Sequence, residues 1–314
     1  MTDRRLDRQQ EALDRLGAIA TANEPLGQYT TYRVGGAAAV FVVPRNVEHL
    51  HLVAEVVRDT GLPTLVVGRG SNLLVADAGF PGIAVSLASM AEWVRFDDVV
   101  VEAGAAMALP VLARRCVGVG LVGFEWAVGV PGSVGGAVRM NAGGHGSDIA
   151  ASLVGVHLLD LRTTSHTWVP VEQLGLRFRG SDIADHQVVL DARLLLQHGD
   201  TMAAEAALAE IVRWRRENQP GGQNAGSVFV NPIPGQLAAA ELIDKARLRG
   251  FRVGGAAVSE KHANFIQAGE NCTAADVRAV MEHVRAEVQR TAGVALRSEV
   301  TLVGFDDLPC EVAR

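Results

Sequence analysis

The first seventy residues switch between helical and extended hydrophobic spacing. Apolar residues recur among charged ones over residues 4–20, which predicts an amphipathic helix with one solvated face. Residues 38–43 form an apolar run typical of a buried strand, and residues 46–59 begin with an asparagine suited to cap a second helix. The β-branched segment 64–67 then predicts another strand. We therefore expect a β-α-β unit that ends in the glycine-rich loop 68–72.

From residue 82 to residue 196 the pattern changes to short apolar segments separated by glycines. One helix, at residues 109–117, interrupts a series of predicted strands at 83–87, 99–103, 154–161, 166–169 and 188–196. No polar linker divides this region from the first, so we expect the two to share an interface.

The last third of the chain is mainly helical. Residues 201–218 carry Ala204, Leu208, Ile211 and Trp214 at helical spacing, which predicts a helix. After Gln219-Pro-Gly-Gly222, the pattern predicts helices at 237–246 and 273–291 with a strand at 264–267 between them. Thr273 and Asp276 match a capping box at the start of the last helix.

Composition and charge exclude several classes of protein. The 314 residues are 48% hydrophobic and 20% charged, as in a globular chain of two or three lobes. A net charge of −6 offers no basic field for nucleic acid or an anionic membrane. Three scattered cysteines indicate neither a disulfide framework nor a metal site, and they favour a reducing compartment. With a charged N-terminus and no long apolar run, we expect a cytoplasmic protein.

Two glycine-rich loops are the candidate binding features. The loop 68–72 follows a predicted strand, and its small residues can present successive N–H groups to a pyrophosphate. The second runs from Gly129 to Gly143. A third segment, 118–123, matches G-x-G-x-x-G, but it follows a helix and leaves no room for another, so we discount it. These patterns predict a dinucleotide or another phosphate-rich ligand and leave its chemistry open.

Five sequence motifs narrow the range of ligands and protein families. They are Thr31-Tyr-Arg-Val-Gly-Gly36, Gly68-Arg-Gly-Ser-Asn72, Gly129-Val-Pro-Gly-Ser-Val-Gly-Gly-Ala-Val-Arg-Met-Asn141-Ala-Gly143, Ala225-Gly-Ser-Val-Phe229 with Asn231-Pro232, and Val258-Ser-Glu-Lys-His262-Ala-Asn-Phe265. With these motifs in order, the chain resembles the UDP-N-acetylenolpyruvoylglucosamine reductase family from about Thr30 to Phe305. The direct passage from the 188–196 strand into the next helix resembles the shorter, type II subclass.

The resemblance implies an α+β fold: the FAD-binding fold of the vanillyl-alcohol-oxidase (PCMH) type in two lobes, plus a C-terminal α+β substrate lobe. We expect the FAD-binding lobes at residues 1–84 and 85–200, with 295–314 completing the second, and the substrate lobe at 201–294. The implied reaction uses NADPH and FAD to reduce UDP-N-acetylglucosamine enolpyruvate to UDP-N-acetylmuramate, a peptidoglycan precursor. It implies no metal, no nucleic acid, no membrane and no obligate protein partner.

The resemblance also assigns residues to the cofactor. The FAD-binding set is Gly68, Arg69, Gly70, Ser71, Asn72, Gly129, Pro131, Gly132, Ser133, Gly135, Gly136, Asn141 and Gly143.

Three residues match the catalytic positions of the family. Hydride addition to an enol ether leaves an enolate, which needs positive charge and a proton donor close by. Ser227 matches the proton donor. Arg179, in Phe178-Arg-Gly-Ser181, matches the residue that pairs with the substrate carboxylate, and Glu299 matches a carboxylate that acts through that arginine.

Substrate contacts are expected from Asn231, Arg215 and Arg216. The family commonly has a lysine for the diphosphate where this chain has Asn218, so either one of the two arginines compensates or the diphosphate is bound more weakly. His145 lies near the flavin loop without an assigned role. Two rivals stay open: another flavin oxidase or dehydrogenase on the same fold, and a non-catalytic nucleotide-sugar sensor.

Overall fold

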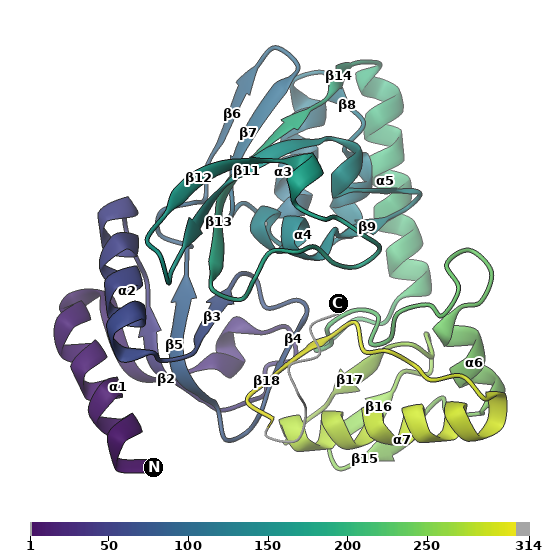
Figure 1. Cartoon of the computed structure of the whole chain (residues 1–314). Coiled ribbons are helices and arrows are strands. Elements are labelled where there is room, and N and C mark those ends of the chain that lie inside the picture. Colours follow the sequence, from purple (N-terminus) through teal and green to yellow (C-terminus); the bar gives the residue numbers. More distant parts are fainter. Residues whose placement is uncertain (1, 306–314) are drawn as a thin grey trace.

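The computed structural model describes residues 2–305 and arranges them around three main sheets (Figure 1). The first sheet has the strand order β1-β2-β5-β3, with β1 antiparallel and the others parallel. Helices α1 and α2 lie side by side against it. The bounds are α1 Thr2–Leu16, β1 Ala20–Pro25, β2 Ala37–Val42, α2 Val47–Thr60, β3 Thr64–Val67 and β5 Phe80–Ser86.

Local signals set the ends of α2. The side chain of Asn46 accepts a hydrogen bond from the backbone N–H of His49 at 2.9 Å, which confirms the predicted cap. Gly61 ends the helix with φ +62°, a left-handed conformation that favours glycine. The predicted β-α-β unit is confirmed, and β3 runs directly into the loop 68–72.

The second sheet is antiparallel, with the order β12-β11-β13-β7-β6. Its strands are β6 Val94–Asp97, β7 Val100–Gly104, β11 Leu153–Asp160, β12 His166–Pro170 and β13 Gln187–Leu195. This part of the chain also contains two helices, α3 (Leu109–Gly118) and α4 (Val134–Met140). It has two short two-stranded ladders as well: β8 (Leu121–Val122) pairs with β14 (Gln197–His198), and β9 (Gly143–Gly144) pairs with β10 (Ser147–Asp148). One buried cluster joins Leu50 of α2 and Ile83 of the first sheet to Val101 and Val156 of the second, so the expected shared interface is confirmed.

The third unit is a small sheet backed by helices. Strands β15 (Arg252–Val253), β16 (Ala256–Val258) and β17 (Ile266–Ala268) pack with α6 (Ala239–Lys245) and α7 (Ala274–Ala292). The capping box of Thr273 and Asp276 is present as predicted. The buried stripe of α7 shares its core with Tyr32 and Leu74 from the start of the chain, so this unit is not packed independently of the first.

Two segments pack differently from the predicted division into lobes. Helix α5 (Thr201–Asn218) was expected in the third lobe, but Leu208 and Ile211 pack against the core shared by the first two sheets, and the helix stands beside α3 (Figure 1). Strand β18 (Thr301–Val303) pairs in parallel with β4 (Leu73–Val75), within the first predicted lobe instead of the second. The rest of the predicted C-terminal segment, 306–314 with Cys310, lies outside the described residues.

Residues 118–123, which match a dinucleotide motif by sequence alone, include the end of α3 and the two-residue strand β8. They do not line the main cavity described below. In the part of the chain that is described, no helix is both long enough and apolar enough to cross a membrane.

Candidate active site

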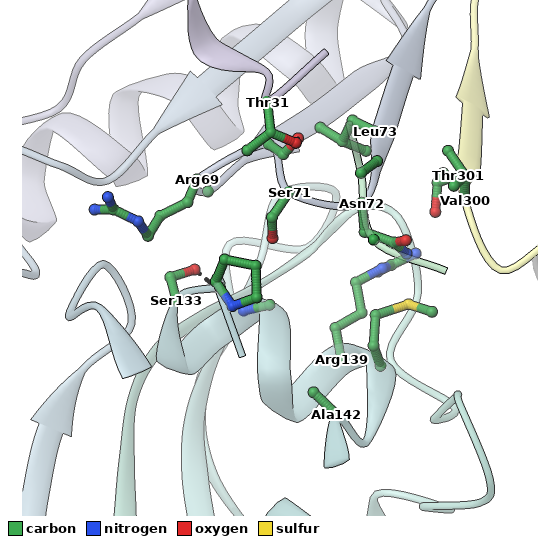
Figure 2. A pocket seen from close by; sticks show the side chains of 18 of the residues that line it. Thr31, Arg69, Ser71, Asn72, Leu73, Ser133, Arg139, Ala142, Val300 and Thr301 are labelled. Atoms are coloured by element: carbon green, nitrogen blue, oxygen red, sulfur yellow. Dashed lines mark hydrogen bonds between the residues drawn. The ribbon is translucent and has the colours of Figure 1, made fainter. Parts of the chain in front are cut away.

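A single large cavity of about 1830 Å³ contains most of the predicted site residues. Both glycine loops line it, together with Arg179, Ser227 and Glu299. Figure 2 shows Ser71 and Asn72 on one side of it, with Ser133 and Arg139 facing them from the other. The two loops touch, because a Cβ added to Gly68 would lie 2.7 Å from the Ser133 hydroxyl.

The loop 68–72 has the geometry of an anion-binding nest. Gly70 adopts φ +59°, and a Cβ there would lie 2.0 Å from the carbonyl oxygen of Tyr29, so only glycine fits. Within residues 2–305, no group accepts a hydrogen bond from the N–H of Gly70, Ser71 or Asn72. Unpaired N–H groups beside a cavity fit a diphosphate such as that of FAD.

The second loop contributes shape more than hydrogen-bond donors. Ser133 caps α4, and the N–H groups of Val134 and Gly135 donate to the carbonyl oxygens of Met107 and Ala105, both at 2.9 Å. A Cβ on Gly135 would lie 2.9 Å from Ala105, so glycine allows close packing there. The predicted cofactor residues of this loop that line the cavity are Gly129, Pro131, Gly132, Ser133, Gly135, Gly136 and Gly143.

Asn141 does not line the cavity, in contrast to the prediction that it binds the cofactor. It is buried, its amide donates to the carbonyl of Arg177 at 3.2 Å, and its side-chain oxygen accepts from the N–H of Ala150 at 3.2 Å. Asn141 thus supports the turn that carries Arg179.

Arg179 lies on a tight turn that aims its guanidinium into the cavity. Arg177 and Gly180 exchange two backbone hydrogen bonds, and Arg179 between them has φ +58°, which is unusual for a residue with a side chain. Its Nε lies 2.9 Å from Oε1 of Glu299, and its terminal nitrogen donates to the carbonyl of Gly143 at 2.9 Å. The guanidinium is thus fixed between Glu299 and the second glycine loop.

Backbone pairing brings Ser227 next to Glu299. The N–H of Glu299 donates to the carbonyl of Val228 at 2.8 Å, one residue beyond Ser227. The side chain of Asn264 fixes the same segment by bonding both backbone groups of Phe229, at 2.9 and 2.8 Å. The structure therefore brings together all three residues predicted to be catalytic.

Asn72 connects the loop 68–72 to the segment before β18 that carries Glu299. Its amide donates to the carbonyl of Glu299 at 2.9 Å, and its own carbonyl accepts from the N–H of Thr301 at 3.0 Å. These two hydrogen bonds hold the first glycine loop and Glu299 in fixed positions relative to each other.

Of the three residues predicted to bind substrate, only Arg215 lines the cavity. It is partly buried and bonds Gln219 at 2.8 Å, and it pairs with no carboxylate among the described residues. Burial lowers the pKa of its guanidinium. Arg216 is exposed outside the cavity, and Asn231 accepts a hydrogen bond from the N–H of Ala239 at the start of α6. Neither residue lines the cavity, and their contacts with a substrate stay predictions.

Trp214, one of the apolar residues that predict the helix at 201–218, lies on the cavity wall with 45% of its surface exposed. Its ring meets that of His145 edge to face at 5.1 Å. Arg139 and Arg297 also line the cavity and were not predicted. The available signal for Trp214 was its position beside Arg215, near the end of a helix.

Burial raises the pKa of Glu299 above its ordinary value, against the opposing effect of Arg179. Ionising this carboxylate therefore costs more free energy in the folded state than in the unfolded state. The free energy of unfolding consequently falls as pH rises through the folded pKa. We expect Glu299→Gln to have a larger free energy of unfolding than the wild type near pH 8, and we expect this difference to vanish near pH 4. Urea unfolding of both proteins at the two pH values measures the difference.

Glu287 provides a control of opposite sign. Arg290 lowers the pKa of its carboxyl, so Glu287→Gln should lose stability at the higher pH. An advantage of Glu299→Gln that is independent of pH would contradict the role of burial.

Comparisons with known proteins agree with this geometry. A family profile described as UDP-N-acetylenolpyruvoylglucosamine reductase, C-terminal domain, matches residues 217–303, and an FAD binding domain profile matches residues 38–167. The reductase of Heliobacterium modesticaldum is 41% identical over 283 residues, which is 90% of this chain and 90% of that protein. The reductase of Bacillus subtilis is 35% identical over 298 residues, covering 94% of this chain and 97% of that protein.

A solved structure gives the same result. The crystal structure of UDP-N-acetylenolpyruvylglucosamine reductase (MurB) from Thermus caldophilus superposes with a TM-score of 0.77 at 32% identity, covering 90% of this chain and 98% of that one. The predicted PCMH-type fold and the FAD cofactor are confirmed. The chain therefore belongs to the UDP-N-acetylenolpyruvoylglucosamine reductase family and is an FAD-dependent oxidoreductase.

Proposed function

We propose that this chain uses NADPH to reduce UDP-N-acetylglucosamine enolpyruvate to UDP-N-acetylmuramate. The observation that carries the proposal is the meeting of Arg179, Ser227 and Glu299 in the cavity that the two glycine loops line. A cation, a hydroxyl and a half-buried carboxylate in one place suit the protonation of an enolate. Membership of the family supports the same reaction.

The residues divide the work by chemistry. The nest of Gly70, Ser71 and Asn72 would hold the cofactor diphosphate, and FAD when bound supplies the hydride. Arg179 pairs with the substrate carboxylate and stabilises the negative charge that develops there. Glu299 positions that guanidinium at 2.9 Å, and the hydroxyl of Ser227 delivers a proton to the enolate carbon.

Arg215 would bind the substrate diphosphate. It carries a half-buried positive charge on the cavity wall. Asn218 cannot supply that charge because its amide is neutral, and the amide donates to the carbonyl of Trp214. We also propose a cytoplasmic location and no obligate protein partner. The free thiols of Cys116 and Cys272 suit a reducing compartment.

The test follows the flavin colour without oxygen. We expect NADPH to bleach the FAD of the purified enzyme, and one equivalent of the enolpyruvyl UDP-sugar to restore it. Bleaching without restoration would overturn the substrate assignment and favour another flavin dehydrogenase. Tight UDP-sugar binding with no bleaching would favour a nucleotide-sugar sensor.

A further inference from the structure

The wall of the cavity beside Arg215 is built from an aromatic pair that the proposed catalytic steps do not use. Trp214 and His145 meet edge to face at 5.1 Å, with an angle of 89° between their rings. Both line the cavity, and Trp214 keeps 45% of its surface exposed. The sequence has four tryptophans, all within the described residues, and only Trp214 lines the cavity.

The position of His145 is built into the fold. It occupies the turn between β9 and β10 with φ +52°, a left-handed conformation that a histidine rarely adopts. Its ring lies so close to Gly129 that a Cβ there would be 2.8 Å from two ring atoms. Glycine at position 129 therefore makes room for the imidazole, in addition to lining the cavity.

The order of groups along the cavity follows the hairpin of β9 and β10. Arg179 bonds the carbonyl of Gly143, His145 lies two residues further along the chain, and its ring meets that of Trp214, the neighbour of Arg215. A sugar that reacts at Arg179 would place its diphosphate toward Arg215 and its base beyond. This is the order of the groups in a nucleoside diphosphate sugar.

We infer that Trp214 is the base-stacking wall for the nucleoside end of the substrate, with His145 fixing the orientation of the indole. The inference rests on the proposed function, because it assumes a nucleotide sugar. An exposed indole beside a half-buried guanidinium that pairs with no carboxylate among residues 2–305 combines a π-face with a cation, and a nucleotide presents the two complementary groups to them. Trp214 would contact the substrate, and His145 would be a positioning residue.

Calorimetric titration of the FAD-loaded enzyme with UDP and with inorganic pyrophosphate tests the inference. We expect Trp214→Ala to weaken UDP binding about tenfold, as expected for the loss of one base stack, with pyrophosphate affinity within about twofold of the wild type. Trp214→Phe should retain most of the UDP affinity. Trp168→Ala, which removes a partly exposed tryptophan outside the cavity, should match the wild type.

His145→Asn separates positioning from backbone strain, because asparagine tolerates the left-handed conformation. We expect it to weaken UDP binding about threefold, in line with the loss of one aromatic pair. In turnover assays, both the Trp214→Ala and His145→Asn variants should raise KM for the UDP-sugar and leave kcat unchanged.

The outcomes separate this inference from the proposed function. If the wild type turns over the enolpyruvyl UDP-sugar and Trp214→Ala binds UDP as tightly as the Trp168→Ala control, the stacking role is overturned and the proposed function stands. If the wild type binds pyrophosphate and not UDP, both fail. Equal losses of UDP and pyrophosphate affinity in Trp214→Ala would also overturn the inference, because they would show a disturbed Arg215.

Discussion

Ser227→Ala should be reduced by NADPH at the wild-type rate and then fail to pass its electrons to the enolpyruvyl substrate. The variant keeps the backbone pairing of Val228 with Glu299, so the shape of the site is preserved. It loses only the hydroxyl that would protonate the enolate carbon. General acid catalysis contributes about 10²- to 10⁴-fold, and turnover should fall by that factor.

Stopped-flow absorbance of the flavin separates the two half-reactions. Ser298→Ala is the matched control, since Ser298 lines the same cavity but its hydroxyl donates to the carbonyl of Val300 at 2.7 Å. It should reoxidise normally. Normal turnover by Ser227→Ala would remove that serine from the mechanism.

Arg179→Gln should lower kcat about 10²- to 10³-fold, the range measured when one donor to a developing oxyanion is removed. The variant removes the charge that faces the substrate carboxylate, and it leaves Glu299 without its partner at 2.9 Å. Arg179→Lys should not restore activity, because an ammonium lacks the planar fork that reaches both Glu299 and the carbonyl of Gly143. Steady-state kinetics with both variants measures this.

Arg193→Gln is a suitable comparison. It breaks another arginine–glutamate pair, to Glu102 at 2.7 Å, on the second sheet and outside the cavity. Its activity should match the wild type. Wild-type turnover by Arg179→Lys would show that charge alone suffices at this position.

The sequence alone predicted the starts of those helices whose capping residues lie next to them in the chain. Asn46 caps α2, and Thr273 with Asp276 caps α7, where the spacing predicts them. Helix α4 was predicted as loop because its sequence contains two adjacent glycines, which are poor helix formers. It forms because Ser133 caps it and Gly135 packs against Ala105, a contact that no local pattern reveals.

The candidate site residues were likewise predictable only in part, because motifs show residue types and not tertiary contacts. The family motifs placed Arg179, Ser227 and Glu299 correctly in one cavity. The motifs did not distinguish an asparagine that lines the cavity, such as Asn72, from one that supports a turn, such as Asn141. Helical periodicity gave the face on which Trp214 lies, and it could not show that this face meets a cavity instead of a core.

The parallel pairing of β4 with β18 has a consequence for synthesis of the chain. Residues 73–75 leave the ribosome early and wait for residues 301–303 before that ladder can form. Asn72 likewise meets the carbonyl of Glu299 only when the last strand arrives. Contacts this distant in sequence form slowly, and domains generally fold as units during translation. The nascent enzyme therefore carries an incomplete active site until β18 has been translated and has paired with β4.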